Sequence, residues 1–270
     1  MNSIQKYKRV CLIGLQNSME YRVNYLTNLI SVLFPILIQY FVWSAVYANK
    51  GPEETVFGYT FLQMMVYSLT AGFIARLTGS AMHYEVSGDI KNGTLSKFLV
   101  QPIRYSSYRI AYFIGEKVSE SSIILCIMAV ILVVLSPLLG LQLEVSNIAL
   151  FLLDIIPVML LNFLMFFCIS LIAFWVIEVG HVYGVIDILI AIASGAILPL
   201  DTFGGGALEI LKLLPFSYTT YFLTNILSGK LLLGDIARGM GVQLLWIGLL
   251  AALTLFLWKK GLKKYVAVGG

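Results

Sequence analysis

The chain has 270 residues, of which 59% are hydrophobic and only 12% are charged, and its mean hydropathy is +0.90. A soluble domain carries about twice that share of charged residues, so the composition excludes a soluble fold and indicates a surface that faces lipid. The small net charge of +4 comes from basic residues beside apolar runs, which argues against nucleic acid as a partner. The three cysteines show no C-x-x-C spacing, and we expect no metal site and no cofactor bound by this chain.

The first 22 residues are expected to form a helix that lies in the membrane interface. Apolar residues recur at helical spacing between charged ones, at Ile4, Tyr7, Cys11, Leu15 and Met19. This pattern gives one narrow apolar stripe on an otherwise polar helix. A disordered start is the alternative, because the stripe is narrow.

Six apolar runs are long enough to cross a bilayer, for which a helix needs about 20 residues. They lie at 24–47, 57–80, 109–138, 147–177, 182–200 and 236–258. We therefore predict an all-α polytopic membrane protein with six transmembrane helices, in which residues 1–270 form a single transmembrane domain. The lipid bilayer is its solvent.

Basic residues fall unequally on the two sides of these spans. Fourteen of the 18 Lys and Arg residues lie before the first span, around the loop between the second and third, or after the last. The other four are Lys50, Lys212, Lys230 and Arg238. Because cytoplasmic loops carry the excess of Lys and Arg, both termini and the loop between spans two and three are predicted to be cytoplasmic.

Residues 85–104 are predicted to be a cytoplasmic segment that carries a docking helix. The acidic start of the segment is expected to be flexible, Thr94 can cap the helix that follows, and Pro102 ends it. Three apolar side chains share one face at i, i+3 and i+4, namely Leu95, Phe98 and Leu99. An exposed apolar face in water needs a partner. The alternative is a helix that lies on lipid without a protein partner.

The apolar stretch between the fifth and sixth spans is broken twice. Pro199, the glycines at 204–206 and Pro215 divide it into helical pieces too short to span, so we predict a re-entrant helical hairpin at 201–230 on the outer side. Such a hairpin can close or shape a pathway, and its candidate gate residues are Pro199, Phe203, Gly205, Pro215 and Phe216. A surface loop with two amphipathic helices is the alternative, and composition does not separate the two.

Two of these segments resemble parts of the ABC-2-type permeases, the membrane subunits of many ATP-driven exporters. Residues 89–95 read Asp-Ile-Lys-Asn-Gly-Thr-Leu, and with Leu99 and Pro102 they resemble the loop between that family's second and third spans. Pro199-Leu200, Phe203 and the Leu-Pro-Phe-Ser run at 214–217 resemble its pair of short outer helices. In topology, the resemblance covers essentially the whole chain.

The resemblance implies a permease subunit of the bacterial inner membrane that forms an export pathway with a second copy or a related permease. Separate ATP-binding-cassette ATPase subunits would bind ATP and Mg, since no G-x-x-x-x-G-K-[ST] loop occurs in this chain. The chain itself would have no catalytic residues. The residues implied to couple it to the ATPase are Asp89, Gly93, Thr94, Leu95, Phe98, Leu99 and Pro102.

Asp154 and Asp187 are ionisable residues inside predicted spans, which makes them candidates for function. Asp154 is placed near the outer face, where a wet interface could solvate it. Asp187 is placed nearer the cytoplasmic end, where pairing with Arg76 or Lys117 is favoured over ion or proton transport. Whether either aspartate contacts cargo or is structural stays open.

Two other classes of function compete with a permease. A membrane enzyme acting on lipids needs convergent His, Asp, Glu or Ser, yet the chain has just two histidines and neither H-E-x-x-H nor G-x-S-x-G. A secondary transporter or channel not driven by ATP is the stronger alternative. A secondary transporter is expected to carry paired inverted repeats with broken spans in both halves, whereas one broken segment is evident.

Overall fold

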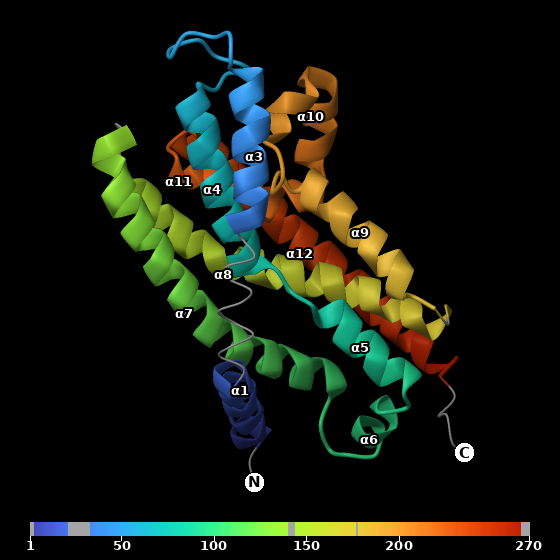
Figure 1. Ribbon diagram of the computed structural model, residues 1–270. Helices are drawn as coiled ribbons and strands as arrows, with labels where there is room; N and C mark the ends of the chain where they lie inside the picture. Colours follow the sequence, from blue (N-terminus) through green and yellow to red (C-terminus); the bar gives the residue numbers. More distant parts are fainter. Residues whose placement is uncertain (1–2, 21–32, 140–143, 177, 266–270) are drawn as a thin grey trace.

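The structure, a computed structural model, describes residues 3–20, 33–139, 144–176 and 178–265. These residues form helices and turns without a sheet (Figure 1). Three helical stretches in this part of the chain are long and apolar enough to cross a membrane, at Tyr105–Val134, Val145–Phe174 and Leu233–Leu262, and shorter apolar helices lie at Phe34–Val46 and Gly180–Ala193. The prediction of an all-helical fold with several apolar spans is confirmed.

The six predicted runs correspond in order to α3 (Leu33–Val46), α4 (Phe61–Thr78), α7 (Tyr105–Leu139), α8 (Val145–Ser170), α9 (Gly180–Ala193) and α12 (Leu233–Leu262). Residues 24–32 of the first run lie outside the described residues. The start of α4 is set by a capping box, in which Thr60 and Gln63 exchange side-chain and backbone hydrogen bonds. The C-terminal end of α8 continues into the 3-10 turn η1 (Leu171–Phe174).

The helical bundle has two ends, which carry different elements. Figure 1 shows α1 (Ser3–Glu20), the short helix α6 and the last turn of α12 at one end, and the turn between α3 and α4 together with α10 at the other. We call the first the basic end, after the lysines at 259–264, and the second the hairpin end.

The centre of the core is α8. It packs against α4, α5, α11 and α12, and 67% of its most apolar stretch is buried inside the chain. The corresponding stretches of α7 and α12 are only 22% and 11% buried. The uncovered apolar side chains of α7 and α12 therefore face lipid or another chain.

At the basic end, α1 lies along the first part of α7 (Figure 1). Two glycines allow the two backbones to touch. A Cβ added to Gly14 would overlap the carbonyl of Tyr112, and one added to Gly115 would overlap the carbonyl of Cys11. The crossing therefore has no room for a side chain at either position.

The face of α1 that makes this contact includes the middle of the predicted apolar stripe, at Cys11 and Leu15, but not its two ends. Val10 and Gly14 are buried, whereas Ile4 and Met19, at the two ends of the stripe, are 82% and 50% exposed. Helical spacing predicted the helix, but close backbone approach selects small residues for the contact, and hydropathy does not detect that requirement.

The segment between α4 and α7 folds into α5 (Met82–Lys91) and α6 (Leu95–Leu99), joined by a turn in which Gly93 has φ of +73°. The expected flexible acidic start is wrong, because those residues form the second half of α5. Thr94 stands at the start of α6, yet its hydroxyl makes no capping hydrogen bond. Pro102 follows α6 in an exposed turn.

The predicted hairpin consists of η2 (Leu200–Phe203), α10 (Gly205–Leu213), η3 (Pro215–Tyr218) and α11 (Tyr221–Leu227). None of the α10 side chains is buried, whereas every residue of α11 is. The surface-loop alternative therefore does not hold for α11, which packs against α8 and α4.

We expect Gly115→Ala to lower the thermal unfolding midpoint in detergent, equivalent to about 1–3 kcal/mol, because the new methyl group overlaps the backbone of α1. Gly248→Ala in α12 is the matched control, since nothing lies within 4 Å of its added Cβ. It should leave the midpoint unchanged or raise it slightly, as Ala favours helix. Equal effects of the two substitutions would contradict the tight crossing.

Candidate functional site

A buried arginine ties α5 to α7. Arg109 of α7 donates from Nη1 to Glu85 Oε2 at 2.6 Å and from Nη2 to Asp89. Its Nε donates to the hydroxyl of Tyr105 at 2.9 Å, and that hydroxyl donates to Asp89 Oδ2 at 2.6 Å. Since Glu85 and Asp89 are four residues apart, both carboxylates lie on the face of α5 that meets α7. We call these four residues the Arg109 clamp.

The short helix α6 sits on this clamp. The Phe98 ring lies 5.2 Å from the Tyr105 ring, edge to face, and Leu95 is fully buried in the core. The prediction that Leu95 and Leu99 share an exposed face is therefore wrong for Leu95. Only Leu99 and Val100 present apolar side chains outward, at 49% and 85% exposure.

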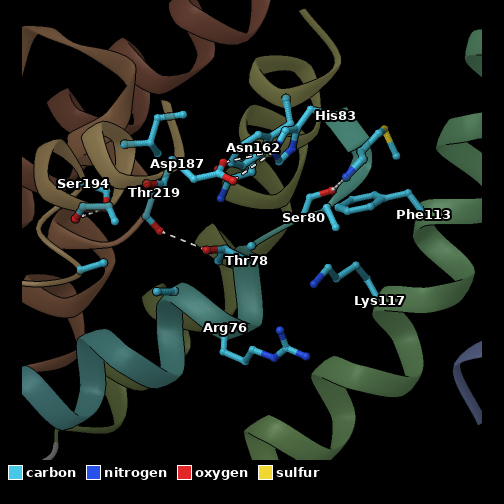
Figure 2. Close-up of a pocket in the computed structure, with 18 of the residues that line it drawn as sticks. Arg76, Thr78, Ser80, His83, Phe113, Lys117, Asn162, Asp187, Ser194 and Thr219 are labelled. Atoms are coloured by element: carbon cyan, nitrogen blue, oxygen red, sulfur yellow. Dashed lines mark hydrogen bonds and ion pairs between the residues drawn. The ribbon is translucent and has the colours of Figure 1, made fainter. Parts of the chain in front are cut away.

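A cavity of about 510 Å³ lies beside the clamp, lined by residues of α4, α5, α7, α8 and α9 (Figure 2). Pockets of roughly 300–1,000 Å³ are typical for small-molecule ligands. We call it the inner cavity. Its charged and titratable wall includes Arg76, His83, Glu116, Lys117, Glu120 and Asp187.

Asp187 of α9 has partners in α5. His83 Nε2 lies 3.2 Å from its carboxylate, and the Tyr84 hydroxyl donates to Asp187 Oδ2 at 3.1 Å. Burial lowers the pKa of His83 against the opposing effect of Asp187, so the imidazole is neutral near pH 7. The expected pairing of Asp187 with Arg76 or Lys117 is wrong, although both cations line the same cavity.

Asp154 of α8 is fully buried, and no hydrogen bond of ordinary geometry reaches its carboxyl oxygens from the described residues, although the side chain of Gln243 lies beside it. The expected wet interface is therefore wrong. Asp154 does not line the inner cavity. Gln243 of α12 is also fully buried, and its Nε2 donates to the Tyr218 carbonyl at 3.4 Å. Asp154 thus belongs to the packed interior of the bundle.

A second polar cluster closes the hairpin end. Asp201 of η2 accepts hydrogen bonds from the Tyr59 hydroxyl at 2.6 Å, the Tyr221 hydroxyl at 3.0 Å and Lys230 Nζ at 3.2 Å. Lys230 also donates to the Tyr59 hydroxyl at 2.6 Å. These four residues, the Asp201 cluster, join the turn before α4, η2, α11 and the turn before α12.

The candidate gate residues fall into two environments. Pro199 and Pro215 are buried, and Phe216 packs against the main core, whereas Phe203 and Gly205 are exposed. The five residues therefore do not share one environment.

Sequence reasoning missed the Arg109 clamp and the Asp201 cluster. In the sequence, Arg109 is only one of the fourteen basic residues that indicate which side of the membrane is cytoplasmic. The signal that could have found the clamp is the spacing of Glu85 and Asp89, which puts two carboxylates on one helical face. For the Asp201 cluster, the signal was an acidic residue at the start of a largely apolar hairpin that ends in Lys230.

Long apolar helices that pack around a cavity with a partly charged wall are typical of an integral membrane protein. Comparison with protein families matches residues 33–269 to the ABC-2 family transporter proteins. A search of curated proteins found no match. Because the family match covers most of the chain, the chain belongs to the ABC-2 transporter family, which confirms the resemblance seen in the sequence.

We expect Arg109→Gln to destabilise the protein by about 3–5 kcal/mol, because it leaves two partly buried carboxylates without their cation. The measurement is thermal unfolding in detergent, with Arg104→Gln, an exposed arginine of the same segment, as control. Adding Asp89→Asn should recover part of the loss. If the double variant lost the sum of the two single effects, the residues would not interact.

A second prediction concerns pH. Burial alone would raise the pKa of Asp201, but the hydrogen bond from Tyr59 and the charge of Lys230 outweigh it and hold that pKa below its ordinary value of 3.8. Because the folded-state pKa is the lower one, ionised Asp201 stabilises the fold above its unfolded-state pKa, and this contribution is lost as the pH falls through the folded-state pKa.

The midpoint difference between wild type and Asp201→Asn should therefore be largest near neutral pH and shrink toward roughly pH 3. Asp235→Asn is the control, since Asp235 forms an exposed pair with Arg238. A difference that stays constant over the whole pH range would show that the charge of Asp201 is not what stabilises the cluster.

Proposed function

We propose that the chain is the permease subunit of an ATP-driven exporter, that it forms the translocation pathway as a dimer with a second copy or a related permease, and that separate ATPase subunits drive it. Membership of the ABC-2 transporter family supports this proposal. ATP and Mg belong to the ATPase subunits in this scheme, because the chain has no P-loop sequence.

The observation that carries the proposal is the construction of α5 and α6. Leu99 and Val100 form an exposed apolar surface at the end of α6, which we call the docking tip. In water, such a surface is expected to bind a partner. Behind the tip, Phe98 packs on Tyr105 of α7, and the Arg109 clamp fixes α5 to the same helix. A force on α6 therefore reaches a long apolar helix through buried rings and ion pairs.

The charge distribution supports a cytoplasmic basic end. In the sequence, fourteen of the 18 Lys and Arg residues lie before the first span, around the loop between the second and third, or after the last, and the structure places α1, α6 and the end of α12 at one end. In that orientation α6 meets a cytoplasmic ATPase, α3, α4, α7, α8, α9 and α12 are the six spans, and α10 with α11 forms an outer re-entrant pair that gates the exit. The setting is a bacterial inner membrane.

We expect the double variant Leu99→Asp, Val100→Asp to lose its co-purifying ATPase subunit, because it places two charges on the proposed docking tip. Recovery of that subunit with the tagged chain should fall by about tenfold or more, as expected for the centre of an interface. Both positions are exposed, so the fold itself should survive. The readout is pull-down in mild detergent followed by identification of the bound proteins.

Leu232→Asp, Leu233→Asp is the matched control, with exposures of 76% and 72% at the opposite end of the molecule. It should retain the subunit. If no ATPase copurifies with wild type under any condition, a secondary transporter or channel becomes the better assignment. If both double variants retain the ATPase equally, α6 is not the coupling element.

A further inference from the structure

The wall of the inner cavity carries negative charge that its own partners do not neutralise. Asp187 accepts hydrogen bonds from His83, which is neutral near pH 7, and from the phenol of Tyr84, so no cation pairs with it among these contacts. Glu116 of α7 forms no ion pair with a described residue, and other carboxylates of the wall act on it as like charges. Carboxylates that share a small space repel each other unless a cation lies among them.

The cations of the wall offset only part of this charge. Two further carboxylates of the wall are already paired with cations, in the pairs Glu120–Lys117 and Glu85–Arg109. Arg76 is half-buried, lines the cavity and forms no ion pair with the described residues. Two carboxylates without a cationic partner, Asp187 and Glu116, therefore stand against one such cation. The balance is negative, and it suits a ligand of positive charge.

An amide without a partner lies in the same wall. Asn162 of α8 lines the cavity and is only 3% exposed, yet its amide forms no hydrogen bond with a described residue (Figure 2). Thr220, just before α11, also lines the cavity and is 2% exposed, and its hydroxyl likewise has no partner there. Because buried polar groups are nearly always hydrogen-bonded, a molecule inside the cavity is expected to supply these partners.

The charged groups occupy different parts of the wall. Figure 2 shows Asp187 and Asn162 in one part, and Arg76 and Lys117 in another. A cation bound at Asp187 and Asn162 thus need not lie against the two cations of the protein. Near it, Asn162 Oδ1 and the oxygen of Thr220 are acceptors for N–H groups.

We propose that the inner cavity binds a protonated primary amine that carries an apolar group, with Asp187 and Asn162 as the residues that bind the ammonium. An ammonium group has one positive charge and three N–H donors, which suit a carboxylate, an amide oxygen and a hydroxyl oxygen. A quaternary ammonium has the same charge but no N–H to donate. An anionic ligand would meet an excess of like charge.

The remaining wall suits the apolar part of such a ligand. Phe113, Phe166 and Ile190 line the cavity beside the polar groups, and 510 Å³ exceeds what an ammonium group alone would fill. Aromatic rings also attract a cation that lies over their faces. As the site for an exported molecule, the assignment rests on the proposed function, whereas binding as such does not.

The test is calorimetric binding to the purified full chain in detergent, with phenylbutylamine as the probe. Three analogues of similar shape are compared with it, namely phenylbutyltrimethylammonium, phenylbutanol and phenylbutyrate. We expect the amine to bind about tenfold or more tightly than the alcohol, the trimethylammonium analogue to bind with intermediate affinity, and the carboxylate to bind most weakly. The proposal is overturned if the amine binds no better than the alcohol, or no better than the trimethylammonium analogue.

Substitutions in the wall test which residues bind the amine. Asp187→Asn should weaken its binding by about tenfold or more, because the charge-assisted hydrogen bond is lost, and Asn162→Leu should weaken it as well. Arg76→Gln should tighten it, since it removes a competing cation, and should leave binding of phenylbutanol unchanged. Glu209→Gln, at an exposed carboxylate of α10, is the control and should bind as wild type does.

Wild-type affinity for the amine in both Asp187→Asn and Asn162→Leu, with the wild-type unfolding midpoint, would contradict the assignment. Arg76→Gln covers the case in which those two variants fail to fold, because it leaves both binding residues in place. Weaker amine binding by Arg76→Gln would overturn the proposal, since the site would then favour anions. No ATPase is present in this assay, so its failure is distinguishable from failure of the pull-down.

Discussion

The buried cation of Arg109 between two carboxylates of α5 is the constraint on which the basic end depends. An intact buried ion pair adds little net stability, because desolvation offsets the Coulomb attraction, but removing one partner is costly. The clamp therefore determines geometry more than stability. It positions α5, which supplies His83 and Tyr84 to the inner cavity, against α7, which supplies Lys117. The same contact supports α6, so the positions of the docking tip and of the cavity wall both depend on the Arg109 clamp.

The two ends of the molecule meet along a short stretch of chain. Thr219 and Thr220 line the inner cavity, and the next residue, Tyr221, donates to Asp201 in the cluster at the hairpin end. Thr78 of α4 also donates to the Thr219 carbonyl at 3.5 Å. The cavity and the Asp201 cluster are thus connected through consecutive residues at the start of α11.

The short helix α6 shows what the spacing of apolar residues predicts and what it does not. The spacing of Leu95, Phe98 and Leu99 predicted one apolar face, and the structure has a helix there. The pattern could not say what covers that face. Leu95 is covered by the protein's own core, whereas Leu99 is half exposed, so the free tip is smaller and lies further along the chain, at Leu99 and Val100. Glycine contacts between α1 and α7 were missed for a related reason, since hydropathy does not record backbone approach.

The sequence by itself determined the membrane class, the apolar segments and the helix breaks at Gly204 and Pro215, together with the family resemblance. These depend on composition, on helical periodicity and on residues that restrict their own backbone, all of which act between neighbours in the chain. Only the tertiary structure decided that Asp187 meets His83, 104 residues away, that Asp154 is buried, and that Tyr59, 142 residues from Asp201, completes its cluster. Those pairings follow from how the helices pack, and packing is a property of the whole chain.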